Sequence, residues 1–329
     1  METQLKNDIK NNILKNVYIF TGVERYLVDY YCNEIINLSV DEDTKEFNYL
    51  KLTSTLPPEE EIDAFASSYP FMSERKVLHI QDSGIFKSAT DGQKKYFEEL
   101  FTNIPDYLII LFAESKTDSR NALFKLAKSR YSVYEFNHKT PNELAVWLSA
   151  FFKKSGKNIN SKDCIYMCEI GGPSMLALKS EAEKLITFLR DKDTITRELI
   201  DNMVTKTVEN KVFDMINDLT MGNKQGAMAK LSDLKALDEE PIKIISIIFK
   251  KFASLHTVLI MKNKSTAEIA RTTSQMEWIV KNNLKLATKL GARKIASVMT
   301  RCRDMDFGIK NGTVEKWLAI ELIIAEIVL

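Results

Sequence analysis

The 329-residue sequence has almost no net charge, few cysteines and no long hydrophobic run. Its 46 basic and 45 acidic residues leave a formal net charge of +1, so overall charge neither requires nor excludes a nucleic-acid partner. The apolar runs are far shorter than the ~20 residues of a membrane-spanning helix, and METQLKNDIKNNILK at the N-terminus lacks the apolar core of a signal peptide. We therefore expect a cytoplasmic protein that has no membrane partner.

Cysteine and histidine are too scattered to indicate a metal site or a catalytic nucleophile. The one close cysteine pair, Cys164 and Cys168, has the i, i+4 spacing of a helix, and zinc sites need such pairs to be backed by further ligands. The other residues of these two types lie far apart in the sequence: Cys32, Cys302, His79, His138 and His256. We expect reduced, structural cysteines, hydrogen-bonded structural histidines and no bound metal.

The segment Asn16–Tyr31 has the order of a phosphate-binding strand, loop and helix but lacks the residues that hold a phosphate. Val17–Phe20 predicts a buried strand and Glu24–Asn33 a helix. A phosphate-binding loop needs several glycines and a lysine followed by a hydroxyl, whereas Gly22 is followed here by the sequence VER. We expect no bound nucleotide or other cofactor, no catalysis by the chain itself and a function in holding partners. A nucleotide-binding switch or ATPase with an atypical loop is the alternative.

Strand and helix patterns alternate over the first ~140 residues, as in an α/β domain. The predicted strands are Val17–Phe20, Phe47–Leu52, Lys76–Gln81, Tyr107–Phe112 and Tyr131–Phe136. The predicted helices are Tyr26–Asn37, Glu59–Ser68, Gly92–Thr102 and Arg120–Lys128. The strand YLIILF is apolar at every position, which is typical of a parallel sheet that helices cover on both faces.

Helical periodicity replaces this alternation after Pro141. Short helices start near Thr140, Ser161, Ser174 and Thr196, and the polar stretch Thr205–Asn210 is a candidate junction. The remaining chain predicts an all-helical domain with these helices: Val212–Met221, Lys224–Leu237, Pro241–Lys262, Ser265–Arg271, Met276–Leu290, Ala292–Lys310 and Thr313–Leu329. We predict three domains, at residues 1–139, 140–210 and 211–329.

This order resembles the delta-subunit family of bacterial DNA polymerase III clamp loaders, which are AAA+ proteins without ATPase activity. The resembling segments are VYIFTGVERYLVDYY, SSYPFMSERKVLHIQD, LIILFAESKTDSRNALFK, GGPSMLALKSEAEKL, VFDMINDLTMGNKQGAMAKL and MDFGIKNGTVEKWLAIELII. The resemblance implies an AAA+-like α/β domain with a parallel sheet, a small helical lid and an all-α C-terminal collar. It also implies a subunit that binds the sliding clamp and holds the ring open for loading onto primed DNA during replication.

The resemblance further implies the partners. They are the sliding clamp (beta subunit), the ATPase subunits gamma or tau, delta-prime and primer-template DNA inside the complex. The chain would act as part of the polymerase holoenzyme, a nucleotidyltransferase complex in the cytoplasm that associates with the nucleoid during replication.

The candidate clamp-binding residues are Pro70, Phe71 and Met72. Pro70 favours a helix end or kink, and Phe71 and Met72 would then lie at the end of an element, where two large apolar side chains can enter a groove on a partner. The alternative is that both residues pack under the sheet, and the resemblance favours the clamp contact. Asp82 and Asp118 lie where an ATPase has its acidic pair and its sensor residue, and we interpret both as caps of helices or turns.

Basic residues are densest in the collar, and the DNA-binding candidates are Phe307 and Lys310. Lysines and arginines on the inner face of a loader could bind phosphates, while Phe307 at a predicted helix break could stack on a base. The alternative is that these side chains form ordinary solvated helix faces. The apolar C-terminus would in part face neighbouring subunits through Ile320, Leu322, Ile323, Ile324, Ile327, Val328 and Leu329.

Overall fold

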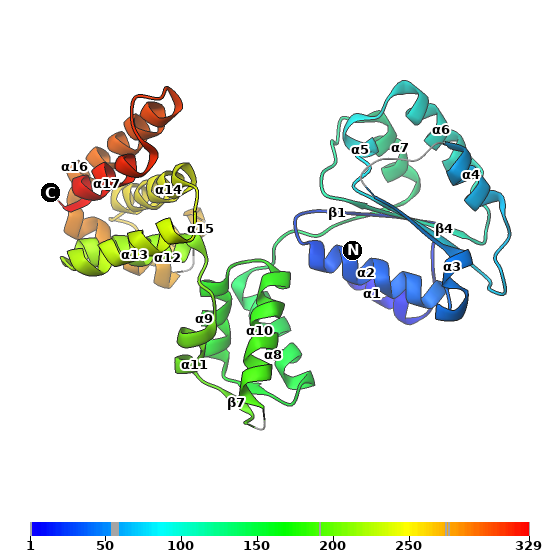
Figure 1. Cartoon of the computed structure of the whole chain (residues 1–329), viewed down its shortest axis with the longest axis horizontal. Coiled ribbons are helices and arrows are strands. Elements are labelled where there is room, and N and C mark those ends of the chain that lie inside the picture. Colours follow the sequence, from blue (N-terminus) through cyan, green and yellow to red (C-terminus); the bar gives the residue numbers. More distant parts are fainter. Residues whose placement is uncertain (1, 54–58, 191, 274, 276, 329) are drawn as a thin grey trace. The chain divides into compact units, whose positions relative to one another are not determined.

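The computed structural model describes residues 2–53, 59–190, 192–273, 275 and 277–328. The chain divides into two compact units, Met1–Met203 and Val204–Leu329 (Figure 1). The predicted α/β and lid segments both belong to the first unit, and the division at 139 and 210 stays a prediction.

The first unit contains a five-stranded parallel sheet of order β2-β3-β4-β1-β5 within the described residues. The strands are β1 (Val17–Thr21), β2 (Tyr49–Thr53), β3 (Lys76–Gln81), β4 (Leu108–Glu114) and β5 (Ser132–Glu135). Every residue of β1 and β4 is buried, which explains their continuous apolar sequences. The predicted fold class, a parallel α/β domain followed by helical parts, is confirmed.

Helices cover both faces of this sheet (Figure 1). The side chains of β1 alternate: Val17 and Ile19 join the core with α4 to α7, whereas the ring of Phe20 lies 6.4 Å from that of Tyr31 on α2. The helices of this part are α1 (Glu2–Lys10), α2 (Arg25–Ser39), η1 (Glu42–Thr44), α3 (Lys45–Asn48), α4 (Glu59–Ser67), α5 (Ile85–Ser88), α6 (Asp91–Thr102) and α7 (Ala122–Arg130).

The predicted strand Phe47–Leu52 is wrong at its start. Phe47 and Asn48 lie in the one-turn helix α3, and the strand begins at Tyr49. Phe47 has the aromatic side chain of a strand residue, but it is 57% exposed, while the amide of Asn48 is fully buried. The sequence pattern indicated burial for the wrong residue of this pair.

The remainder of the first unit consists of α8 (Pro141–Lys154), α9 (Ser161–Gly171), α10 (Met175–Leu189) and α11 (Arg197–Met203). The start of α8 is a capping box, in which Thr140 accepts from the Glu143 amide and the Glu143 carboxylate accepts from the Thr140 amide. A two-stranded parallel sheet of β6 (Asn158–Ile159) and β7 (Thr194–Ile195) was not predicted, because two-residue strands leave no periodic pattern.

The second unit is all-helical within its described residues. It contains α12 (Val208–Met221), α13 (Lys224–Ala236), α14 (Pro241–Ile260), α15 (Thr266–Thr273), α16 (Glu277–Lys310) and α17 (Lys316–Val328). Gly291 interrupts α16 with a φ of 78°, so the expectation of two helices meeting there is confirmed. The predicted start of the first of them, Met276, lies outside the described residues.

The C-terminal helix α17 fills the core of its own unit. Ile320, Ile323, Ile324 and Ile327 are all buried there. These four residues therefore do not face neighbouring subunits, because they cover α12, α14 and α16, and the expectation that part of this apolar set does so stays a prediction. Leu322 is 38% exposed and stays available to a neighbour, whereas Leu329 lies outside the described residues.

Candidate functional site

The loop after β1 passes too close to the end of β5 for any residue but glycine at position 22. Gly22 has a φ of 118°, and a Cβ atom there would lie 2.2 Å from the carbonyl oxygen of Phe136. The Phe136 amide donates to the Thr21 carbonyl, and the Glu24 amide donates to the Phe136 carbonyl. The single glycine of the loop thus serves a backbone contact within the chain.

Two backbone amides of this loop, those of Glu24 and Arg25, already donate hydrogen bonds within the chain. The amide of Glu24 lies 3.0 Å from Phe136 O, and the amide of Arg25 lies 3.1 Å from Val23 O. A phosphate-binding loop points its amides at the ligand, whereas these two amides bind carbonyl groups of the chain. The loop has the position of a phosphate-binding loop, but its amides bind the chain itself and not a ligand.

The carboxylate of Glu24 binds the N-terminus of a lid helix. Glu24 is 1% exposed, and its Oε2 atom accepts from the Met175 amide at 3.1 Å and lies 3.2 Å from Nδ1 of His138. Met175 is the first residue of α10, so the carboxylate lies at the positive end of the helix dipole, where anions bind favourably. A side chain of the loop therefore holds the position that a bound anion could take.

Two acidic residues, Asp82 directly after β3 and Glu114 as the last residue of β4, connect the two strand ends. Asp82 accepts from the amide and hydroxyl of Ser115 at 2.8 and 2.6 Å. Glu114 accepts from the amides of Ser83 and Gly84 at 3.0 and 3.1 Å, and its burial raises the pKa of this carboxyl. Asp82 therefore links the ends of two strands and does not act as the predicted local cap, and Glu114 is a buried acid that was not predicted from the sequence.

Asp118 also binds its own turn, since it accepts from the Arg120 amide at 2.8 Å. Asn121, and not Asp118, is the N-cap of α7.

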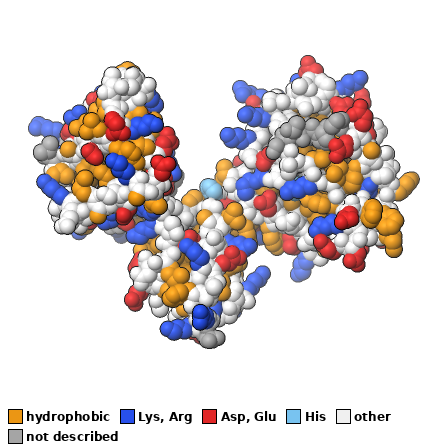
Figure 2. Space-filling model, viewed as in Figure 1, with side chains coloured by type: hydrophobic (Ala, Val, Ile, Leu, Met, Phe, Trp, Pro, Cys, Tyr) orange, Lys and Arg blue, Asp and Glu red, His pale blue; other side chains and the backbone are white. Residues whose placement is uncertain are grey.

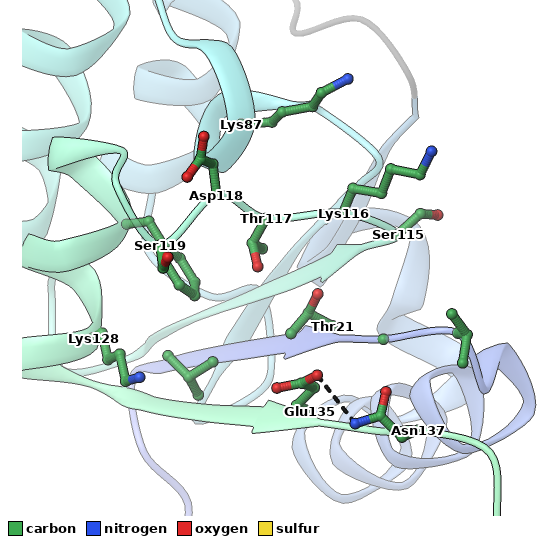
Figure 3. Close-up of a pocket in the computed structure, with 14 residues that line it drawn as sticks. Thr21, Lys87, Ser115, Lys116, Thr117, Asp118, Ser119, Lys128, Glu135 and Asn137 are labelled. Carbon is green, nitrogen blue, oxygen red and sulfur yellow. Dashed lines mark hydrogen bonds between the residues drawn. The ribbon is translucent and has the colours of Figure 1, made fainter.

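An open cavity of about 640 Å³ lies at this edge of the sheet (Figure 3). Lys87, Lys116 and Lys128 line it, together with hydroxyl side chains of the segment Ser115–Ser119. Lys87 and Lys116 extend away from Thr21 in Figure 3, and Lys128 lies on the opposite side of the cavity. The ammonium groups of these lysines do not converge on one point, as a phosphate site would need.

The segment between α4 and β3 exposes its large apolar side chains. Tyr69 is 83% exposed, Phe71 51% and Met72 80%, while Pro70 is partly buried. Met72 has a φ of 49°, which is uncommon for a residue other than glycine. The helix α4 ends before Pro70, as predicted, and Phe71 and Met72 lie in the exposed connection between α4 and β3, not under the sheet.

The terminal nitrogen of Lys76 fixes the chain that enters this segment. Lys76 is 3% exposed, and its Nζ atom donates to the carbonyls of Phe65 and Ser68 at 2.9 and 3.3 Å. The same atom lies 4.0 Å from the centre of the Phe65 ring. Burial lowers the pKa of Lys76, and the hydrogen bonds replace the water that this group has lost.

Two domain models of one protein family match most of these residues. A model described as DNA polymerase III, delta subunit matches residues 18–137, and a second model, which describes the C-terminal domain of the same protein, matches residues 209–327. The matches together cover more than half of the chain. The chain belongs to the delta-subunit family of DNA polymerase III.

Individual relatives agree with this family over almost the whole chain. The DNA polymerase III subunit delta of Bacillus subtilis is 23% identical in an alignment of 335 positions that covers 97% of this chain and 94% of that protein. A probable DNA polymerase III subunit delta of Aquifex aeolicus is 22% identical in an alignment of 259 positions that covers 76% of this chain and 72% of that protein.

A solved structure shows the same fold. The Bacillus subtilis DNA clamp loader delta protein (YqeN) matches with a TM-score of 0.57 and 21% identity, over 100% of this chain and 99% of that one. Family and fold together assign the chain to the delta subunits of the DNA polymerase III clamp loader and therefore to DNA replication.

The structure places the collar candidates of this delta-family chain on one exposed helix face. Phe307 is 68% exposed and lies within α16, so its predicted position at a helix break is wrong, because the helix continues to Lys310. The Nζ atom of Lys310 lies 2.6 Å from the Asp306 carboxylate, and Arg303 lies 2.9 Å from Asp304. The basic side chains beside Phe307 are thus paired with acids of the same helix, as the alternative of solvated faces expects.

Cysteines and histidines behave mostly as structural residues. All four cysteines are free and buried, and no group of three or more metal-ligating side chains occurs among the described residues. His79 departs from the expectation of complete hydrogen bonding: its Nδ1 atom lies 3.0 Å from the Tyr49 hydroxyl, but its buried Nε2 atom has no partner within the described chain. In the described part of the chain, no helix is long and apolar enough to span a membrane.

Proposed function

We propose that the chain binds the sliding clamp through Pro70, Phe71 and Met72 and holds its ring open while the loader places it on primed DNA. The exposure of Phe71 and Met72 carries this proposal, since two large apolar side chains at an element end gain most of their burial from a partner. The hydrogen bonds of Lys76 to Phe65 and Ser68 fix the chain before Pro70 and leave Phe71 and Met72 accessible.

The second part of the proposal is that the chain acts without nucleotide or catalysis of its own. The loop after β1 uses the amide of Glu24 for a bond to Phe136 and the carboxylate of Glu24 for a bond to α10. Both features oppose a bound phosphate, and they argue against the alternative of an ATP-dependent switch. ATP-driven rearrangement would come from the ATPase subunits, gamma or tau, with delta-prime as a further neighbour in the cytoplasmic, nucleoid-associated complex.

The third part concerns DNA. Phe307, with its exposed ring, would stack on an unpaired base at a primer-template junction. Lys310 would break its ion pair with Asp306 and bind a DNA phosphate instead. Because the neighbouring charges are paired within α16, binding by the isolated chain is expected to be weak and nonspecific.

The clamp contact is tested by titrating the full chain and its Phe71→Ala/Met72→Ala variant with purified sliding clamp. Truncating a buried anchor costs roughly 2 kcal/mol, about thirtyfold in affinity, so the double variant should lose on the order of a thousandfold. Phe188→Ala is the matched control, because Phe188 is an aromatic residue with 62% exposure on α10. Unchanged clamp affinity in the folded double variant would place the contact elsewhere.

A further inference from the structure

The side chain of Asn48 holds the backbone of Phe71 by two hydrogen bonds. Its Oδ1 atom accepts from the Phe71 amide at 2.8 Å, and its Nδ2 atom donates to the Phe71 carbonyl at 2.8 Å. Asn48 is fully buried, so these bonds are shielded from water and use both ends of its side-chain amide. An apolar residue of similar size could fill the space but could not make this pair.

Phe47, the residue before Asn48, contacts the side chain of Phe71. The two ring centres lie 4.8 Å apart with an angle of 48° between the planes, within the range of favourable aromatic pairs. Phe47 comes from α3, 24 positions before Phe71 in the sequence, and remains 57% exposed despite this contact. The short helix α3 therefore supplies two contacts to Phe71: the ring of Phe47 packs on its ring, and the side-chain amide of Asn48 binds its backbone.

Four large apolar side chains are exposed in the segment between α4 and β3 and on α3, and two of them, Phe47 and Phe71, are in direct ring contact. We define the tip patch as Phe47, Tyr69, Phe71 and Met72, whose exposed fractions run from 51% to 83%. Tyr69 lies at its margin, where its ring centre is 5.3 Å from that of Tyr107. Figure 2 shows hydrophobic side chains gathered at the edge of the first unit where α3 lies. Scattered exposed apolar residues need no explanation, but neighbouring ones indicate a binding surface.

We propose that α3 completes the clamp-binding site, with Phe47 as a further contact residue and Asn48 as the residue that positions Phe71. This inference rests on the proposed clamp contact of Phe71 and Met72 and extends it to a second segment. The expected occupant is an apolar groove of the sliding clamp that is wide enough for Phe47 beside Phe71.

Fixing the Phe71 backbone before binding would strengthen the contact. A tip that is already ordered loses less conformational entropy when it enters a groove, so more of the burial energy appears as affinity. The left-handed backbone at Met72 fits this interpretation, because an uncommon conformation persists only where neighbouring contacts hold it. Asn48 supplies such contacts directly at the preceding residue.

The contact role is tested with Phe47→Ala in the full chain, titrated with purified sliding clamp. We expect about a tenfold loss of affinity, the size typical of a truncated interface aromatic, with an unchanged melting temperature because Phe47 is more than half exposed. Phe188→Ala again serves as the exposed-aromatic control and should bind within about twofold of wild type.

The positioning role of Asn48 is tested first without any substitution. In the wild-type chain, the Phe71 amide should exchange with solvent at least ~10-fold more slowly than an unprotected amide, although its side chain is half exposed. Rapid exchange would contradict a fixed tip. Asn48→Ala should remove this protection and lower clamp affinity about fivefold, and the same substitution should cost nothing further in a Phe71→Ala background.

The outcomes separate this inference from the proposal on which it rests. If Phe71→Ala/Met72→Ala loses binding while Phe47→Ala binds like wild type, α3 is no part of the site and the inference is overturned, but the clamp contact stands. If neither variant loses binding, the clamp contact itself fails. A loss in Asn48→Ala that persists unchanged in the Phe71→Ala background would assign Asn48 to folding alone.

Discussion

The loop after β1 and the tip between α4 and β3 differ in whether their side chains find partners within the chain. In the loop, the Glu24 carboxylate and the neighbouring amides all bind groups of the same chain. In the tip, the chain fixes the backbone of Phe71 and leaves the apolar side chains exposed. We infer from this difference that the loop contributes stability, and the proposed role of the tip is binding.

This comparison gives two opposite expectations for substitutions. Changes in the loop should lower the free energy of unfolding and leave the clamp affinity of the folded protein intact, whereas changes in the tip should do the reverse.

Gly22→Ala should cost about 4 kcal/mol of unfolding free energy, because the new Cβ would overlap Phe136 O and the residue would be held in a strained backbone region. Urea unfolding measures this loss. Gly84→Ala is the matched control, since Gly84 also has a positive φ of 75° but a Cβ there would meet no described atom within 4 Å. It should cost only about 1 kcal/mol. Equal losses in the two variants would show that the Phe136 contact contributes nothing.

Acid should destabilise the first unit through His79. Its burial lowers the pKa of His79 to about 4, so the unfolded chain, with an ordinary pKa near 6.5, binds the proton more tightly. Stability is therefore present above pH 6.5 and falls as the pH drops from 6.5 to 4, by up to about 3 kcal/mol. The pH dependence of urea unfolding measures the effect. His79→Gln should flatten that profile, and a profile identical to wild type would rule His79 out as its source.

Removing the Glu24 carboxylate should cost about 2 kcal/mol, the size of a lost hydrogen bond to a charged group that leaves a buried amide unpaired. Glu24→Ala tests the whole interaction by thermal unfolding. In Glu24→Gln an oxygen can still accept from the Met175 amide, so we expect that variant to lose less than about 1 kcal/mol. If Glu24→Ala instead gains affinity for ATP, the carboxylate has been excluding a nucleotide.

Phe71→Ala/Met72→Ala should change the unfolding free energy by less than about 0.5 kcal/mol, since exposed side chains contribute little to the core. Thermal and urea unfolding of the variant used for clamp binding supply this number. A loss above about 2 kcal/mol would mean that the tip is part of the core, and the contrast with the loop would disappear.

Sequence patterns predicted most of the first unit because its strands are buried runs between periodic helices. All five predicted strands exist, and β3 matches its predicted bounds at Lys76–Gln81. The sequence-based predictions fail where a helix or strand is only a few residues long. Phe47 has the composition of a strand but lies exposed on α3, and two-residue strands such as Asn158–Ile159 give no signal.

The candidate site was predictable only in part. Pro70 indicates an element end, and exposure of Phe71 and Met72 follows from it. The role of Asn48 depends on a contact across 23 positions of sequence, and no local pattern contains such a contact. The hydrogen bond between the Glu24 carboxylate and the Met175 amide could not be predicted for the same reason, because the two residues lie 151 positions apart. For Glu114, an acid at the end of a strongly apolar strand was a usable sequence signal.

We propose that this chain holds the clamp through its tip and does so without nucleotide. Equilibrium titration of the isolated full chain with purified sliding clamp, in parallel with and without saturating ATP and Mg²⁺, tests both parts in one experiment. The account predicts specific binding with the same dissociation constant in both series, and loss of binding in both when Phe71 and Met72 are alanine. Clamp binding that requires ATP, or that survives the double substitution, would contradict it.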